Sequence, residues 1–213
     1  MIVKKIFNLN NLFKTLLIVL GCFIISIGID FYIKSNIGGD SMTTFLQGGN
    51  LKFNLKEGTI SLLINLVFVL LTLFINYRKI GIGTIIIVFA YGLVLNVVLA
   101  NSIIPFSQSF FVSIIYSIIG IFFVSLAITI WINTNFGVSP LEGFAISISE
   151  KTKIPFWVLK VVIDLTLLLS GILMGGTFGA GTIISSFLVG PSINVMSKVY
   201  LLLKNKIKPQ IHG

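Results

Sequence analysis

The chain is organised around residues 179–195, which read GAGTIISSFLVGPSINV. Residues 81–97 read GIGTIIIVFAYGLVLNV, and nine of the seventeen positions are identical. Apolar bias explains matched isoleucines and valines, but it does not explain three glycines, a threonine and an asparagine in register. We infer that the sequence is a tandem repeat, a feature that fixes the architecture before any local prediction.

A second pair of short motifs gives nearly the same period. Asn36 and Gly38 recur as Asn135 and Gly137, ninety-nine residues later. An Asn-x-Gly sequence at the end of a helix is typical of a left-handed cap. Each half is therefore predicted to run from an Asn-x-Gly turn, through a middle segment, into a segment that begins Gly-x-Gly-Thr.

The composition is that of a membrane protein. Hydrophobic residues make up 56% of the 213 residues and charged residues only 10%, whereas soluble domains carry about 25% charged residues. The mean hydropathy is +1.08. Residues 80–141 contain no charge, and this run is long enough for two spans because one span needs about 20 apolar residues.

We predict an all-α bundle of six membrane-spanning helices. They are placed near residues 13–33, 58–77, 83–103, 109–132, 155–175 and 178–200. The chain is then divided into a cytoplasmic N-terminal segment (1–12), a first three-span repeat (13–103), a second three-span repeat (109–200) and a basic cytoplasmic tail (201–213).

Lysine and arginine predict how these helices are oriented. With the N-terminus in the cytoplasm, twelve basic residues lie inside and three, Lys34, Lys52 and Lys56, lie outside. The positive-inside rule therefore places both termini in the cytoplasm. Because a repeat of three spans is odd-numbered, the second copy must cross the membrane inverted relative to the first. Inverted repeats are the architecture of many secondary transporters.

Two polar segments, 38–54 and 137–149, separate the first and second spans of each half. Both mix apolar residues with Ser, Thr and Gly, which is the composition of a short interfacial or re-entrant helix; the sequence leaves this choice open. Non-helical backbone at membrane depth must be buried in protein or line a cavity. The two segments are therefore candidates for gates on opposite sides.

Asp164 is the strongest candidate for a functional residue. It lies nine residues beyond Pro155, so about 14 Å into a hydrocarbon core of about 30 Å. A carboxylate at that depth is costly and marks an ion or substrate path, although a structural ion pair with Lys160, four residues earlier, is the alternative. The corresponding residue of the first half is Asn65, and a neutral amide opposite the acid indicates an asymmetric pocket.

Two further acids are Glu142, within the second polar segment, and Asp30, before the first. Glu142 comes shortly after Pro140 and is either a solvated acid stabilised by a helix dipole or an acid of a gate or coupling site. Its counterpart in the first half is Thr43. Asp30, near the outer end of the first span, is expected to reach water.

The Gly-x-Gly-Thr segments carry Thr84 and Asn96 in the first half, and Thr182 and Asn194 in the second. At about 100° per residue, their glycines and asparagine fall on one narrow stripe of a helix. Such a stripe is typical of close helix packing in which the asparagine hydrogen-bonds a neighbour. The alternative is that the two threonines face a substrate.

Residue usage argues against several classes of function. Cys22 is the only cysteine and His212 the only histidine, so we expect no metal site, no cofactor and no enzymatic activity. Gly-x-Gly-Thr is not a phosphate loop here, because no strand precedes it and no lysine completes it.

The net charge of +9 reflects the cytoplasmic loops, not nucleic-acid binding. The expected partners are membrane lipids and an unidentified small molecule; a homo-oligomer or a membrane-protein partner stays open.

The second half also resembles a known group. Residues 136–143 (FGVSPLEG), Lys160-x-x-x-Asp164, residues 175–182 (GGTFGAGT) and Gly190-Pro191 resemble the YczE/YitT group of bacterial integral membrane proteins. That group has an LGxxPxDG-like turn, an Arg-x-x-x-Glu pair and a GGxxGxGT segment. The resemblance covers about residues 30–200 and implies a bacterial cytoplasmic-membrane location, but it supplies no substrate. In the first half, Ser41 and Thr43 replace the proline and the acid.

The sequence therefore predicts a secondary transporter or exporter of an unidentified small molecule, with a site between the halves near Asp164, Asn65, Thr84 and Thr182. The competing hypothesis is a non-transporting membrane protein, an accessory or assembly partner. In that case the glycine stripes only pack helices and the Lys160–Asp164 pair only fixes their register.

Overall fold

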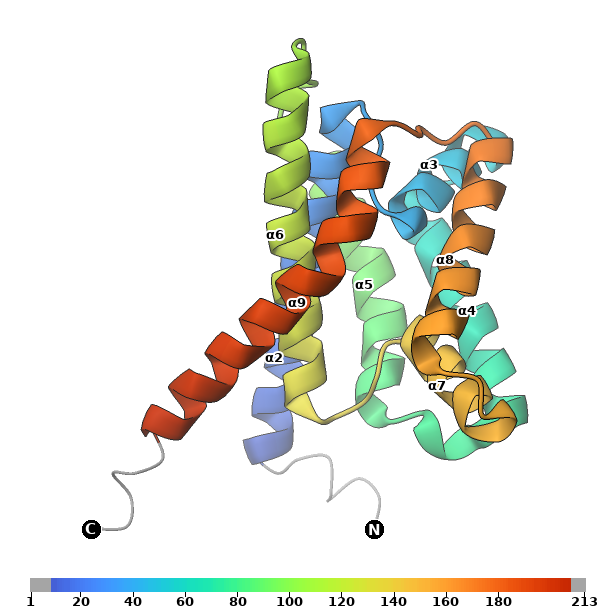
Figure 1. Cartoon of the computed structure of the whole chain (residues 1–213), viewed down its shortest axis with the longest axis vertical. Helices are drawn as coiled ribbons and strands as arrows, with labels where there is room; N and C mark the ends of the chain where they lie inside the picture. The colour runs from blue at the N-terminus through green and yellow to red at the C-terminus, as the bar shows by residue number, and fades with distance from the viewer. Residues whose placement is uncertain (1–8, 208–213) are drawn as a thin grey trace.

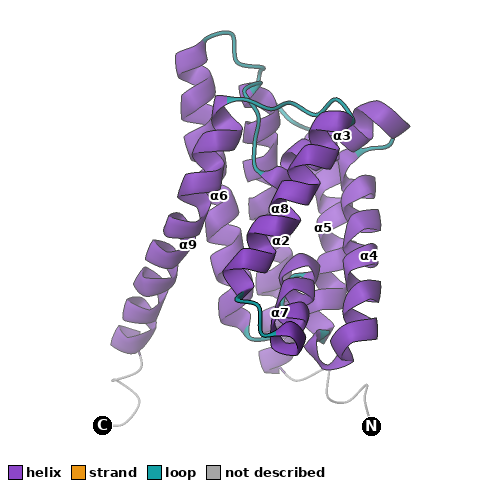
Figure 2. Ribbon diagram, turned by 45° about the vertical axis from the view of Figure 1, so that its right-hand side comes forward, coloured by secondary structure: helices purple, strands orange, loops and turns teal. Residues whose placement is uncertain are grey.

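The computed structural model describes residues 9–207, which form eight α-helices, one 3-10 turn and no strand (Figure 2). The elements are α2 (Leu9–Ser35), α3 (Ser41–Phe53), α4 (Glu57–Asn76), η1 (Tyr77–Lys79), α5 (Ile82–Ala100), α6 (Phe110–Thr134), α7 (Pro140–Thr152), α8 (Phe156–Leu173) and α9 (Ala180–Ile207). Six of them are long and apolar enough to cross a membrane. The all-α class and the number of spans are therefore confirmed, and the chain is a multi-pass membrane protein.

The predicted boundaries differ from the observed ones mainly at the two ends. The first helix begins at Leu9, and the last one continues to Ile207 through much of the predicted basic tail. This helix continues because Leu201, Leu202 and Leu203 extend its apolar run. Predictions for residues 1–8 and 208–213, including His212, lie outside the described residues.

The helices form two groups of four. In the first group α2 packs against α5 and α6, and α6 packs against α9. In the second group α3 packs against α8, and α4 packs against α7. Figure 1 shows the first group on the left and the second on the right, and the α4–α5 contact joins them.

The centre of the first group is packed tightly between α2 and α6. Gly21 makes room for Trp131, because a Cβ atom at this glycine would overlap the indole ring. The indole Nε1 donates a hydrogen bond to the Ile18 carbonyl at 3.1 Å. Cys22 lies beside them with 0% exposure and packs there as a small side chain.

The short helices of the two halves begin and end at corresponding residues, whereas α9 extends beyond the residue that corresponds to the end of α5. α3 and α7 are each 13 residues long, and each ends on a left-handed residue, Asn54 (φ 54°) and Lys153 (φ 65°). Asn36 (φ 57°) and Asn135 (φ 48°) terminate α2 and α6 in the same way, so the two predicted caps are confirmed. Both pairs are separated by 99 positions (153 − 54 and 135 − 36).

The two short helices lie toward opposite ends of the molecule. α3 is near the upper end in Figure 1, and α7 is near the lower end. The first helix begins, and the last one ends, at the lower end. Helical structure in the two polar segments was predicted and is confirmed.

Candidate functional site

The two halves are joined where the Asn-x-Gly turn of each half meets the Gly-x-Gly-Thr segment of the other. The N–H of Gly83 donates to the carbonyl of Phe136 at 3.0 Å, and the N–H of Gly181 donates to the carbonyl of Ile37 at 2.9 Å. The first N–H groups of a helix have no partner within it. Each turn thus supplies an acceptor for the start of α5 or α9.

Glycine is required here because two backbones approach closely. A Cβ atom at Gly83 would lie 2.8 Å from the Phe136 oxygen, and one at Gly181 would overlap the Gly38 oxygen. Gly38 itself has a φ of 86°, in the left-handed region that favours glycine. The Gly-x-Gly-Thr sequence is therefore explained by docking between the halves.

The two threonines of this motif are buried at the same joints. Thr84 is 2% exposed and donates through Oγ1 to the Val138 carbonyl at 2.7 Å. Thr182 is 1% exposed and lies against Gly38, and its Oγ1 has no hydrogen-bond partner among the residues that the structure describes. Thr84 has a similar neighbour in Gly137, because a Cβ atom built at that glycine would lie 2.5 Å from the Thr84 backbone nitrogen. These contacts favour the packing interpretation of both threonines.

The predicted pair of Lys160 and Asp164 forms on α8. The Lys160 Nζ atom lies 2.6 Å from Asp164 Oδ1 and 2.8 Å from Oδ2. Each side chain is about a third exposed, 32% and 34%. The Ser41 hydroxyl, at the start of α3, also donates to Asp164 Oδ1 at 3.1 Å. The carboxylate is therefore held by two helices and remains accessible.

Two more carboxyl groups face this pair from the starts of the short helices. Asp40 caps α3 by accepting a hydrogen bond from the Thr43 N–H at 2.7 Å. Glu142 lies in the first turn of α7, which begins at Pro140. The charges of Lys160 and Asp164 act on both acids. We call Asp40, Glu142, Lys160 and Asp164 the charge cluster.

The charge cluster contains three carboxyl groups and one ammonium group. Burial raises the pKa of Asp40 and of Glu142; the charge of Lys160 lowers both values and that of Asp164 raises them. Glu142 is partly exposed and lies in the first turn of α7, so both interpretations of this acid stay predictions. Lys160 is therefore the one cation within this cluster that acts on all three carboxyl groups.

Sequence reasoning missed Asp40 and Ser41. The available signal was an aspartate immediately before a Ser-x-Thr segment, which is typical of a helix N-cap. Asn65 was predicted to share the pocket with Asp164, but its amide donates to the Ser61 carbonyl of its own helix at 2.8 Å. Asn65 is 4% exposed, and its amide is hydrogen-bonded within α4.

The two glycine–asparagine stripes have different surroundings. Asn96 Oδ1 accepts a hydrogen bond from the Gly58 N–H at 2.9 Å, and its Nδ2 donates to Thr59 Oγ1 at 3.3 Å. Asn194 is exposed, and no atom lies within 4 Å of a Cβ atom built at Gly190. Close packing is therefore seen along the α5 stripe, whereas on α9 it is seen at Gly179 but not at Gly190 or Asn194.

Asp30 does not reach water, contrary to the prediction. It is 2% exposed and accepts a hydrogen bond from the Ser102 hydroxyl at 2.5 Å. The linker between the halves lies over the end of α2. The linker, the end of α2 and Val97 line a pocket of about 390 Å³.

Comparison with known proteins identifies a family. The model described as "Family of unknown function (DUF6198)" matches residues 12–198. An "Uncharacterized protein" of Haemophilus influenzae (strain Rd) is 25% identical over 179 residues, which is 84% of this chain and 81% of the relative. "Uncharacterized protein YyaS" of Bacillus subtilis (strain 168) is 23% identical over 193 residues, 88% of this chain and 95% of the relative. No solved structure matches.

Proposed function

The chain belongs to the DUF6198 family, and from its own geometry we propose that it is a secondary transporter or exporter of a small molecule. The substrate or coupling site is the charge cluster, where the starts of α3 and α7 meet α8. The two halves are inverted repeats, and transport proceeds as they exchange conformations.

Three observations support the inverted repeat. The boundaries of α3 correspond to those of α7, the two helices lie toward opposite ends (Figure 1), and the turn contacts are reciprocal. With the positive-inside rule, the termini lie in the cytoplasm. The resemblance to the YczE/YitT group supports a location in the cytoplasmic membrane of a bacterium.

The charge cluster is the observation that carries the proposal. Charged side chains in a membrane-spanning helix are costly and are retained at ion or substrate paths. A helix register needs one ion pair, and Lys160–Asp164 supplies it. Asp40, which also caps α3, and Glu142 in the first turn of α7 add two more acids, so the cluster holds more carboxyl groups than one ion pair needs.

The test is untargeted metabolite profiling of cells and medium. A deletion strain is complemented with the wild-type protein, with Asp164→Asn, or with Glu150→Gln as a control. Glu150 is an exposed acid paired with Lys79, with a side chain 50% exposed. We expect one small molecule to change in the deletion strain and in Asp164→Asn, and to recover with the other two proteins. Identical profiles in all strains would contradict transport.

A non-transporting accessory protein is the second candidate, and the surface of α9 favours it. Phe187 is 73% exposed and Val195 is 61% exposed, so a partner helix could pack there as well as lipid. Purification in a mild detergent decides between the two. Co-purification of one membrane protein in constant ratio, together with unchanged metabolites, would favour this candidate.

A further inference from the structure

The pocket at the end of α2 holds a buried carboxyl group with one unsatisfied oxygen. Asp30 is 2% exposed and lines this pocket together with Ser102 of the linker. Its Oδ2 atom accepts the Ser102 hydroxyl at 2.5 Å, but its Oδ1 atom has no hydrogen-bond partner within residues 9–207. Leaving a buried acceptor unsatisfied costs free energy, so a donor brought by a ligand would be stabilised at Oδ1.

The carboxyl group of Asp30 forms no ion pair with the part of the chain that the structure describes. Lys34, one turn further along α2, acts on Asp30 through its charge. Its ammonium group, however, lies over the ring of Phe106, 4.1 Å from the ring centroid. A buried carboxylate is costly unless a cation is paired with it, so the pocket favours a ligand with a positive charge.

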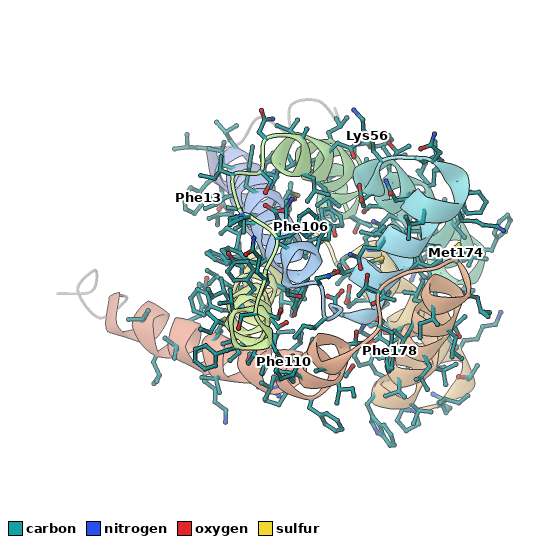
Figure 3. The ribbon with its side chains drawn as sticks, turned by 90° about the horizontal axis from the view of Figure 1, so that it is seen from above. Phe13, Lys56, Phe106, Phe110, Met174 and Phe178 are labelled. Atoms are coloured by element: carbon teal, nitrogen blue, oxygen red, sulfur yellow. The ribbon has the colours of Figure 1, made fainter. Side chains whose placement is uncertain are left out.

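The linker is fixed in place beside this carboxyl group. The N–H of Ser107 donates to the Lys34 carbonyl at 2.8 Å, and the Ser102 hydroxyl binds Asp30. Seen from above, Phe106 lies over the end of α2 (Figure 3), where it meets the Lys34 ammonium group. Three contacts along the linker therefore hold it against α2, and the pocket is already formed without a ligand, as is usual for small-molecule sites.

The walls of the pocket indicate what kind of cation fits. Apart from Asp30, Asn101 and Ser102, the pocket is lined by aliphatic side chains, among them those of Ile27, Val97, Val98 and Ile103. Calcium and magnesium need about six or more oxygen ligands, which these walls do not supply. An organic ammonium ion with an apolar body matches them better. Because Oδ1 needs a hydrogen-bond donor, a primary ammonium, which carries three N–H donors, fits better than a quaternary one.

We propose that this pocket binds a primary ammonium group attached to an apolar body, with Asp30 as its counter-ion. Asp30 lies five residues before the end of α2, so about 8 Å from that end, and Val97 and Ile103 are 57% and 96% exposed. The pocket is therefore open near one end of a membrane-spanning helix, where the headgroup of an aminophospholipid and a soluble amine both have access. The inference does not rest on the proposed transport, because the pocket shares no residue with the charge cluster.

Thermal unfolding of the purified, delipidated full-length protein in maltoside detergent tests the proposal, because a ligand of the folded state raises the melting temperature. The soluble probes are n-hexylammonium and hexyltrimethylammonium; the lipid probes, in mixed micelles, are dioleoyl phosphatidylethanolamine and dioleoyl phosphatidylcholine. We expect a primary ammonium probe at tenfold excess over its Kd to raise the melting temperature by roughly 3–6 °C. Its quaternary counterpart should have a clearly smaller effect. The probe that acts, amine or lipid, identifies the source of the ammonium group.

Asp30→Asn should abolish the shift, because the amide keeps an acceptor for Ser102 but carries no charge. Glu57→Gln is the matched control: it removes an acid in the first turn of α4 that does not line the pocket, and the shift should remain. Should Asp30→Asn fail to fold, Val97→Phe keeps the acid, fills the pocket and should likewise abolish the shift.

Three results would overturn the proposal. They are the absence of a shift with every probe, equal shifts with primary and quaternary head groups, and an undiminished shift in Asp30→Asn or, if that variant does not fold, in Val97→Phe.

Discussion

The N–H of Gly181 donates a hydrogen bond to the Ile37 carbonyl at 2.9 Å, joining the start of α9 to the turn after α2. The corresponding bond joins Gly83 to Phe136 at 3.0 Å, between α5 and the turn after α6. The motif that defines the repeat in the sequence is therefore the element that connects the two halves in space.

Gly181→Ala should destabilise the protein. The added methyl group would overlap the Gly38 backbone oxygen, and overpacking of this kind costs about 1–3 kcal/mol. Thermal unfolding in detergent measures the loss. Gly190→Ala is the matched control on the same helix, because its methyl group meets no atom within 4 Å and alanine favours a helix. Equal losses in both variants would contradict the docking role of Gly181.

Much of this fold could be predicted because its signals are local or repeated. Apolar runs gave the six spans, and Asn36 and Asn135 indicated helix ends by their type and spacing. The position of α9 could not be predicted, because Gly190 and Asn194 repeat Gly92 and Asn96 while their neighbours differ. Two halves with the same motif can therefore pack differently, because the motif allows a close helix contact but does not determine whether another helix lies there.

The candidate site was predictable only in part. Lys160 and Asp164 are four residues apart on one helix, so their pairing follows from helix geometry. Asp40, Ser41 and Glu142 approach them from helices distant in sequence, and such convergence depends on tertiary packing. Asn65 was assigned by symmetry, but its amide binds its own helix.

Asp164→Asn should abolish the metabolite change that the wild-type protein produces, because the amide keeps its shape but cannot carry a negative charge or a proton. Breaking a fully buried ion pair costs about 3–5 kcal/mol, and since a third of each side chain is exposed here, we expect a smaller loss of stability. Immunoblotting of membranes measures the protein level.

The double variant Lys160→Met/Asp164→Asn separates coupling from packing. It removes both charges at similar volume, so the protein level should recover relative to Asp164→Asn. We expect function to stay lost. Recovery of level and function together would show that the pair has only a structural role.

Stability should depend on pH through Glu142. Burial raises its pKa above the ordinary value of 4.5, so the folded protein binds more protons than the unfolded chain in the window above that value. The contribution of Glu142 to folding stability is therefore greatest at and below pH about 4.5 and is lost as pH rises through the raised pKa. Glu142→Gln should flatten this part of a melting-temperature profile recorded against pH. A profile identical to the wild type would contradict the assignment.

The central claim is that the charge cluster is reached from both sides of the membrane in turn, and accessibility of Ser41→Cys tests it most directly. The variant is made with Cys22→Ala and treated with a membrane-impermeant thiol reagent in right-side-out and inside-out vesicles. Cysteines at Lys52 and Lys151, exposed in the last turns of α3 and α7, report the two sides and should each react from one side only. Our account predicts that Ser41→Cys reacts from both sides. Reaction from a single side, with both reporters behaving as expected, would contradict it.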